Sequence, residues 1–185
     1  GETVKVTDLV VTAVPKTGNP LTIWAQLDPG VPYGGIAIQP PKGGKVTVQP
    51  GDKITVTGKI FDLFGLRILS EASVESTQQG VPLPAPLTVD VAMLGAPPAS
   101  LSYRSLLVQV NNVKVTADNA DAEAGSDYGE IELNDVLRVD DLLAAWGVDL
   151  PRPKVGDLFA FIRGVQFHSF ANDKLVPRSP ADFGK

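Results

Sequence analysis

The sequence predicts a mostly β protein made of two similar five-stranded barrels in tandem. Three observations predict this class: apolar and polar residues alternate with period two, turn-forming residues recur at short intervals, and the second half repeats the first. With 185 residues, of which 43% are apolar, the chain suffices for one domain or two small ones with packed cores. No apolar run approaches the roughly 20 residues that a membrane-spanning helix requires.

The first half, residues 1–83, contains five alternating segments separated by breaks rich in Gly and Pro. No stretch of this half has the helical period over a useful length, so the first barrel is expected to lack a helix. We expect its strands over residues 4–14, 21–27, 36–38, 53–61 and 66–74.

The second half, residues 84–185, repeats these features. Tyr-Gly opens an alternating strand at 33–38 and again at 128–133, and Gly-Asp precedes a strand at 51–52 and at 156–157. The pattern Gly-x-x-Phe-x-x-Phe also occurs twice. Because both copies keep its aromatic pair, we expect the pair to close each core. The alternative is a loop that grips a ligand. Its members are Phe61 and Phe64 in the first copy and Phe167 and Phe170 in the second.

The second copy carries an extra segment with helical spacing. Val139, Leu142, Leu143 and Trp146 lie at i, i+3, i+4 and i+7, which is one face of a helix. We therefore predict a short helix near 139–146, between the third and fourth strands.

Alternating prolines at 82–86 favour a semi-rigid connection, and we place the domain boundary near Pro84.

Five strands with a helix between the third and the fourth is the order of the OB-fold, a small partly open barrel. The first half contains VVTAV, IWAQLD, YGGIAIQP and VQPGDKITVTGKIFDLFGLRIL, and it resembles the OB-fold segments of bacterial secreted nucleases and large surface proteins. The second half contains YRSLLVQVNNVKVT, YGEIELNDVLRVDDLL and VGDLFAFIRGVQFHSFANDKLVPRSPADF, and it is similar to a domain of exported lipoproteins of myxobacterial type.

This resemblance covers most of the chain, and its motifs are turn glycines, strand alternation and the closing PRSPAD. It implies an extracytoplasmic location (periplasmic, outer-membrane-anchored or secreted), with a lipid anchor upstream of this chain. In such nucleases catalysis belongs to a separate domain, so the resemblance brings no catalytic residue with it.

Composition argues against several classes of function. Residues 1–83 carry seven basic and seven acidic side chains, while residues 84–185 carry nine basic and fourteen acidic ones and so supply the net charge of −5. No basic patch is visible, which counts against nucleic acid as the main ligand.

The absence of Cys excludes disulfides, thiolate zinc sites and cysteine nucleophiles. The one histidine, His168, is interpreted as a surface or packing residue, because no Gly-x-Ser-x-Gly motif accompanies it.

A ligand-binding face is predicted around Trp24, which shares the polar face of its strand with Thr22 and Gln26. OB-folds bind oligonucleotides or oligosaccharides across this region, often by stacking on an aromatic side chain. Tyr33 extends such a platform, with Lys53 or Lys59 nearby. The alternative is that Trp24 covers a barrel mouth or packs on the other barrel.

The acidic segment at 119–130 has oxygen-bearing side chains at relative positions 1, 3, 5, 9 and 12, a spacing similar to a Ca²⁺-binding loop. Its Gly falls at position 7 rather than 6, and its flanks read as strands, so a solvated acidic loop is the alternative. The predicted calcium ligands are Asn119, Asp121, Glu123, Asp127 and Glu130.

Together these features predict a non-catalytic extracytoplasmic binding or scaffold module of a bacterial lipoprotein or secreted protein. Its expected partners are an oligosaccharide, single-stranded nucleic acid or another surface protein. One alternative is single-stranded nucleic acid or oligosaccharide binding through the Trp24 face, accessory to a secreted nuclease. A second is a hydrolase that uses paired carboxylates.

Overall fold

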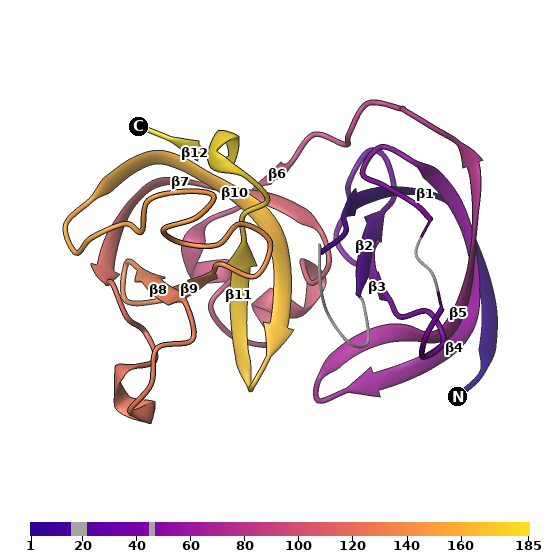
Figure 1. The fold of residues 1–185 in the computed structure, drawn as a ribbon, viewed down its shortest axis with the longest axis horizontal. Coiled ribbons are helices and arrows are strands. Elements are labelled where there is room, and N and C mark those ends of the chain that lie inside the picture. Colours follow the sequence, from indigo (N-terminus) through magenta and orange to yellow (C-terminus); the bar gives the residue numbers. More distant parts are fainter. Residues whose placement is uncertain (16–21, 45–46) are drawn as a thin grey trace.

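The alternating segments fold into two closed β-barrels that lie side by side, so the predicted fold class is confirmed (Figure 1). The structure is a computed structural model that describes residues 1–15, 22–44 and 47–185. Leu21, expected to begin the second strand, and residues 16–20 of the first predicted break lie outside this description.

Barrel one has the strand order β1-β2-β3-β5-β4, and β1 pairs with β4 to close it. β3 and β5 are parallel, and the remaining neighbours are antiparallel. Its strands are β1 (Thr3–Ala13), β2 (Ile23–Gln26), β3 (Gly35–Ile38), β4 (Lys53–Leu63) and β5 (Leu66–Gln78).

Barrel two has the equivalent order β7-β8-β9-β11-β10, closed by pairing of β10 with β7. Again the third and fifth strands, here β9 and β11, are parallel. The short strands β6 (Leu87–Thr88) and β12 (Phe183–Gly184) extend the sheet beside β7 and β10. The barrel strands are β7 (Leu107–Ala117), β8 (Glu130–Leu133), β9 (Leu137–Asp140), β10 (Leu158–Ser169) and β11 (Asn172–Val176).

The repeated Gly-Asp pair forms the same turn in both barrels. In barrel one the Gly51 amide donates to the Val11 carbonyl at 2.9 Å. The Val11 amide in turn donates to the Asp52 carbonyl, also at 2.9 Å. Gly156, Val115 and Asp157 form the same two bonds in barrel two, also at 2.9 Å. Both glycines have positive φ, 89° and 96°, a conformation that side chains disfavour, and this explains why Gly stands at this position twice.

The predicted helix near 139–146 is absent. Val139 belongs to β9, and the described helical turns are all short 3₁₀ segments: η1 (Val91–Met93), η2 (Ala99–Ser102), η3 (Ala122–Ala124) and η4 (Pro180–Asp182). None of these is long and apolar enough to cross a membrane.

Aspartate side chains explain why the helical spacing does not produce a helix. Asp140 accepts the Leu142 amide at 2.9 Å, Asp141 accepts the Trp146 amide at 3.0 Å, and Asp149 accepts the Ala145 amide at 3.0 Å. A helix over 139–146 would direct the Ala145 and Trp146 amides at its own carbonyls, and these are the amides that Asp149 and Asp141 bind instead.

The strand at 130–133 is also the second strand of its barrel rather than the third, so the Tyr-Gly match joins non-equivalent strands. Asn134 and Asp135, with φ of 52° and 58°, turn the chain directly into β9, which pairs antiparallel with β8.

Three buried clusters form the core. One fills barrel one around Ile54 and Val56, and a second fills barrel two around Val110 and Ile131. The third, here called the interbarrel cluster, joins the barrels. It consists of Ala13, Trp24, Ala37, Leu66, Ile68 and Val165, with Leu63, Leu143 and Phe167 packed against it.

Candidate functional site

Trp24 does not form a ligand platform, which corrects the predicted binding face. Alternation does place it on the outer surface of barrel one, since its neighbours Ile23 and Ala25 point into that barrel's core. Barrel two, however, covers this surface. Trp24 is 1% exposed and meets Phe167 edge to face with ring centroids 5.3 Å apart. The alternative that it packs on the other barrel is the correct one, because apolar surface on both barrels is removed from water together.

The other residues assigned to that face do not assemble around Trp24. The ring of Tyr33 is 76% exposed, and its backbone amide donates to the Ser102 carbonyl at 2.6 Å. Lys53 pairs with Asp8 at 3.1 Å, and Lys59 pairs with Glu71 at 2.6 Å. These hydrogen bonds lower the pKa of both carboxyls. Both lysines are thus committed to carboxylates of their own barrel.

The acidic segment directs its oxygens at cations of the protein rather than toward a common centre. Asp121 and Glu130 both accept from Arg138 Nη1, at 2.9 and 2.8 Å. Asp127 accepts from Arg152, a hydrogen bond that holds the pKa of its carboxyl below the usual value. The other two predicted ligands do not join these side chains. Asn119 Oδ1 accepts the Asp121 amide at 2.9 Å, and Glu123 is exposed on η3.

Among the described residues, no group of three or more His, Cys, Asp and Glu side chains is placed to hold a metal ion. In the described residues the oxygens of Asp121, Glu130 and Asp127 turn toward the guanidinium groups of Arg138 and Arg152. Calcium binding itself stays a prediction.

Lys174 lies at the centre of a buried charge cluster on the outer face of β8, β9 and β11. It is 2% exposed and donates to Glu130 and to Asp140, the latter at 3.2 Å. Burial raises the pKa of Asp140 even though Lys174 opposes the shift. Two carboxylates thus flank one ammonium group, and charge compensation, rather than paired acid and base chemistry on a substrate, is the role that this enclosed geometry supports.

His168 is a buried packing residue at the junction of the barrels. Its Nδ1 lies 2.9 Å from Asp173 Oδ1 and 2.9 Å from Arg104 Nη2. Ser100 Oγ donates to Asp173 at 2.6 Å rather than to the histidine, so the three side chains do not form a nucleophilic triad. Arg104 also donates to the Gly65 carbonyl of barrel one, which makes this cluster a clamp between the two barrels.

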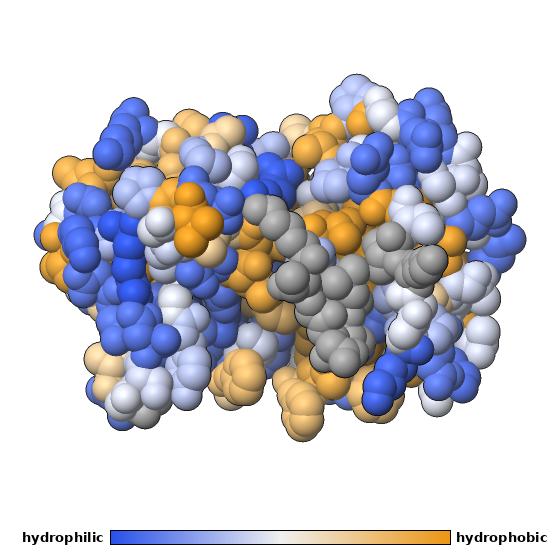
Figure 2. Space-filling model, viewed as in Figure 1, coloured by the Kyte–Doolittle hydropathy of each residue, from blue (hydrophilic) through white to orange (hydrophobic). Residues whose placement is uncertain are grey.

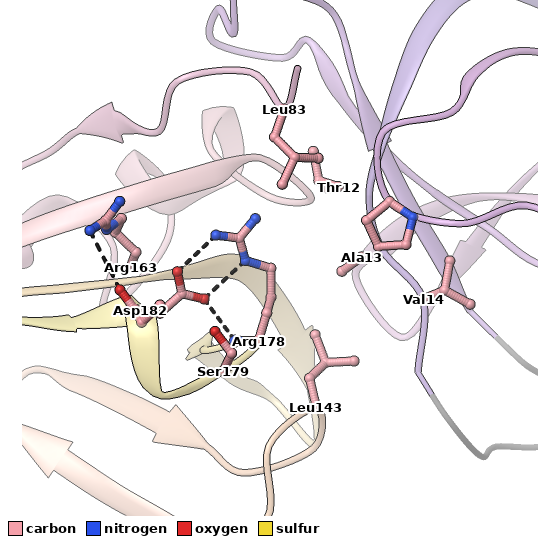
Figure 3. A pocket seen from close by; sticks show the side chains of 11 residues that line it. Thr12, Ala13, Val14, Leu83, Leu143, Arg163, Arg178, Ser179 and Asp182 are labelled. Carbon is pink, nitrogen blue, oxygen red and sulfur yellow. Dashed lines mark hydrogen bonds and ion pairs between the residues drawn. The ribbon is translucent and has the colours of Figure 1, made fainter. Parts of the chain in front are cut away.

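A pocket of about 440 Å³ lies where the barrels meet, and Figure 3 shows its lining. The end of β1 forms one wall, and β10 and the segment after β11 form the opposite wall. Apolar side chains predominate, with two arginines, one carboxylate and two hydroxyls among them. The lining residues are Thr12, Ala13, Val14, Pro50, Leu83, Leu143, Arg163, Arg178, Ser179, Ala181 and Asp182.

The charged lining of this interbarrel pocket has an excess of one positive charge. Arg178 forms a two-pronged pair with Asp182, at 2.9 and 2.8 Å. Arg163 contacts the Ala181 carbonyl at 3.5 Å and lies 4.3 Å from the centroid of the Phe161 ring. Two arginines and one aspartate therefore face a pocket in a protein whose net charge is −5.

Both arginines also hold buried nitrogens for which the described residues supply no hydrogen-bond partner: Nη1 of Arg178 and Nε of Arg163. A buried N–H without an acceptor is unfavourable, and a ligand oxygen would remove that cost. In Figure 3 the guanidinium of Arg178 extends beyond its pair with Asp182 toward the space below Leu83.

Sequence reasoning did not assign these arginines a function. Arg178, Ser179 and Asp182 fall in the closing PRSPAD, which was read only as a structural motif. The i,i+4 spacing of Arg178 and Asp182 was the available signal. Nothing in the local sequence places Arg163 beside them, because the two segments meet only through barrel closure.

Comparison of the chain with protein families, with curated proteins and with solved structures found no match. The resemblance to exported lipoproteins and secreted nucleases therefore stays a prediction, and the function is argued from geometry.

Proposed function

We propose that this protein is a non-catalytic extracytoplasmic module that binds a small organic anion in its interbarrel pocket. The observation that carries the proposal is the pair of arginines among the lining residues, each with one buried N–H group that lacks an acceptor among the described residues. A pocket of about 440 Å³ is within the usual size range of small-molecule sites. The extracytoplasmic location rests on the resemblance alone.

The lining indicates the chemical class of the ligand. Its excess positive charge suits a carboxylate or phosphate, which guanidinium groups bind through strong charge-assisted hydrogen bonds. Its apolar side chains are aliphatic, and no aromatic ring is among the lining residues that the structure describes. Base or sugar stacking therefore has no partner there, and an aliphatic acid fits better than a nucleotide.

Isothermal titration with sodium octanoate and octyl phosphate tests the proposal, with 1-octanol as the neutral probe of the same chain length. We expect saturable binding of at least one anion and little binding of the alcohol. Arg163→Gln should weaken anion binding about 10–100-fold, the value of a charge-assisted hydrogen bond. Arg67→Gln, on the exposed face of β5, is the matched control and should bind as the parent does.

Two results would contradict this function. Equal affinity for octanoate and octanol would show that the arginines play no part, and absence of binding by both anions would remove the pocket from consideration. A fluorescently labelled oligothymidylate is titrated in parallel at physiological salt. Tight, salt-sensitive binding of that probe would favour the nucleic-acid alternative instead.

A further inference from the structure

Two phenylalanines occupy the turns of the equivalent hairpins β4–β5 and β10–β11. Phe64 is 87% exposed and Phe170 is 90% exposed, so the expectation that they close the barrel cores is wrong. Phe167 packs in the interbarrel cluster, and Phe61 is about half-exposed. The outermost aromatic residue of each hairpin is thus largely exposed, and the ring of Phe170 has Lys174 Nζ 5.7 Å from its centroid.

The backbone makes phenylalanine an unfavourable choice at both turns. Phe64 and Phe170 have φ of 51° and 50°, and the residues that follow them, Gly65 and Ala171, have φ of 92° and 62°. Two consecutive positive values define a type I′ turn, where Asn and Gly are favoured and a bulky residue is an outlier. Both stability and solubility would favour asparagine, yet both copies have phenylalanine. Backbone strain that persists at a position despite its energetic cost is typical of functional sites.

The two turns lie next to each other on one edge of the molecule. Arg104, from the connection between the barrels, donates to the Gly65 carbonyl and also contacts His168 of β10 at 2.9 Å. A Cβ on Gly65 would lie only 3.2 Å from His168 Nε2. Both hairpins end at the lower edge in Figure 1, and Figure 2 shows two apolar protrusions there. The clamp therefore holds the two hairpins side by side.

The shape of this edge favours a soft partner over a second folded protein. A stable protein interface buries about 800 Å² per partner, whereas two phenylalanines offer roughly 300–500 Å². The rings protrude, and a folded partner would have to provide a pocket for each. The interfacial region of a lipid bilayer accepts an apolar ring on a protruding turn without a preformed pocket.

We propose that Phe64 and Phe170 insert together into the interfacial region of a lipid bilayer and dock the protein on its surface. The inference stands independently of the anion pocket. Asp62 and Arg67 face each other across the β4–β5 hairpin, so the charge of that hairpin is balanced. The whole chain carries −5, and an anionic surface repels it. The preferred surface is therefore zwitterionic phosphatidylcholine.

Vesicle co-sedimentation of the full chain tests this docking. With phosphatidylcholine vesicles we expect weak, reversible binding, half complete at about 1 mM lipid, which is weaker than a myristoyl chain provides. Vesicles containing phosphatidylglycerol should bind less at low salt. Phe64→Asn and Phe170→Asn should each weaken binding roughly tenfold or more, because each removes one of the two rings that the bilayer buries. Both should fold at least as well as the parent, since asparagine suits the turn.

Leu158→Asn provides the matched control. Leu158 is 70% exposed at the opposite end of β10 from Phe170, so its loss removes exposed apolar surface without touching the turns. Parental vesicle binding is expected for it. Failure of the parent protein to sediment with either vesicle type would overturn the proposal, as would equal binding by the double asparagine variant. Concentration-dependent dimerisation that the asparagine variants abolish would assign the rings to self-association instead.

Discussion

Trp24 is the largest of the fully buried side chains, and both barrels contribute to its surroundings. We expect Trp24→Ala to lower the free energy of unfolding by about 3–5 kcal/mol, because truncating a buried aromatic leaves a cavity. Trp24→Phe should cost less, since it keeps a ring against Phe167 and removes an indole Nε1 that has no hydrogen-bond partner among the described residues. Urea unfolding measures both losses. A loss below 1 kcal/mol for the alanine variant would mean that the interbarrel cluster contributes little.

Asp140 provides a prediction about pH. Burial raises its pKa in the folded state, so the folded protein binds this proton more tightly than the unfolded chain does. Its ionisation therefore costs stability as pH rises from the ordinary value of 3.8 through the raised pKa. Asp140→Asn imitates the protonated acid and should raise stability at pH 7, with a gain that shrinks toward zero as pH falls below that window. Thermal unfolding of both proteins from pH 3 to pH 8 checks the sign, and a gain that grows on acidification would contradict it.

The repeated Gly-Asp turn allows one element to be compared in two environments. Asp52 Oδ2 accepts the Gln49 amide at 3.1 Å in a fully buried site, and Asp157 Oδ2 accepts the Lys154 amide at 2.9 Å in an exposed one. Removing the buried carboxylate deletes a charge-assisted hydrogen bond within the fold, whereas water replaces the exposed acceptor. We expect Asp52→Ala to cost about 2–3 kcal/mol and Asp157→Ala less than about 1 kcal/mol. Equal losses of unfolding free energy in urea would show that burial does not determine how much the aspartate of this turn contributes to stability.

The segment at 119–130 is expected to respond little to calcium. Its carboxylates Asp121, Asp127 and Glu130 already hold arginine and lysine side chains, which calcium would have to displace. The melting temperature should therefore be the same in millimolar CaCl₂ and in a chelator. An increase of several degrees with calcium, abolished by Asp127→Asn, would show instead that the segment rearranges into the predicted site.

At the scale of the molecule, the two barrels should unfold as one unit. Arg104 joins Gly65 of barrel one to Asp173 of barrel two, and the Leu107 amide donates to Gln26 Oε1 across the junction at 2.7 Å. Trp24 reports on barrel one and its junction with barrel two, and Trp146 reports on barrel two. We expect the fluorescence transitions of Trp146→Phe and Trp24→Phe, each with one tryptophan left, to be single and coincident with far-UV circular dichroism. Separate transitions would show independent barrels.

Arg104 is expected to carry much of this coupling. Arg104→Gln leaves the buried Asp173 carboxylate without its cation and should cost about 3–5 kcal/mol. Adding Asp173→Asn should recover part of that loss, because the uncompensated charge is then removed. A double variant less stable than the single one would contradict the assignment of the loss to the charge.

The architecture was predictable because its signals are local. The alternation over 53–61 and 66–74, the Gly-Asp turns and the repeated Gly-x-x-Phe-x-x-Phe each describe one element, and the strands formed as expected. The helix near 139–146 failed for a local reason as well, since Asp149 and Asp141 bind the Ala145 and Trp146 amides that a helix needs. Asn134-Asp135, a turn signal, marks the hairpin that takes Val139 into β9.

The candidate site was less predictable because it depends on contacts between distant segments. Alternation correctly placed Trp24 outside barrel one, but only the docking of barrel two decides that the surface is covered. Arg163 and Arg178 face one pocket because β10 and the segment after β11 meet the end of β1. No spacing within either segment encodes that meeting.

Barrel two covers one face of barrel one and leaves the hairpin turns exposed. Natural variation therefore has different consequences at these two kinds of position. A substitution at Trp24 is felt in both barrels at once, so selection for stability dominates that surface and leaves little scope for a new specificity. A substitution in the turns at Phe64 or Phe170 disturbs no core, so these positions can diverge at small cost to folding. In a lineage that descends from such a tandem, we expect the outer face of barrel one to change slowly and the hairpin turns to change quickly whenever the surface to be bound changes.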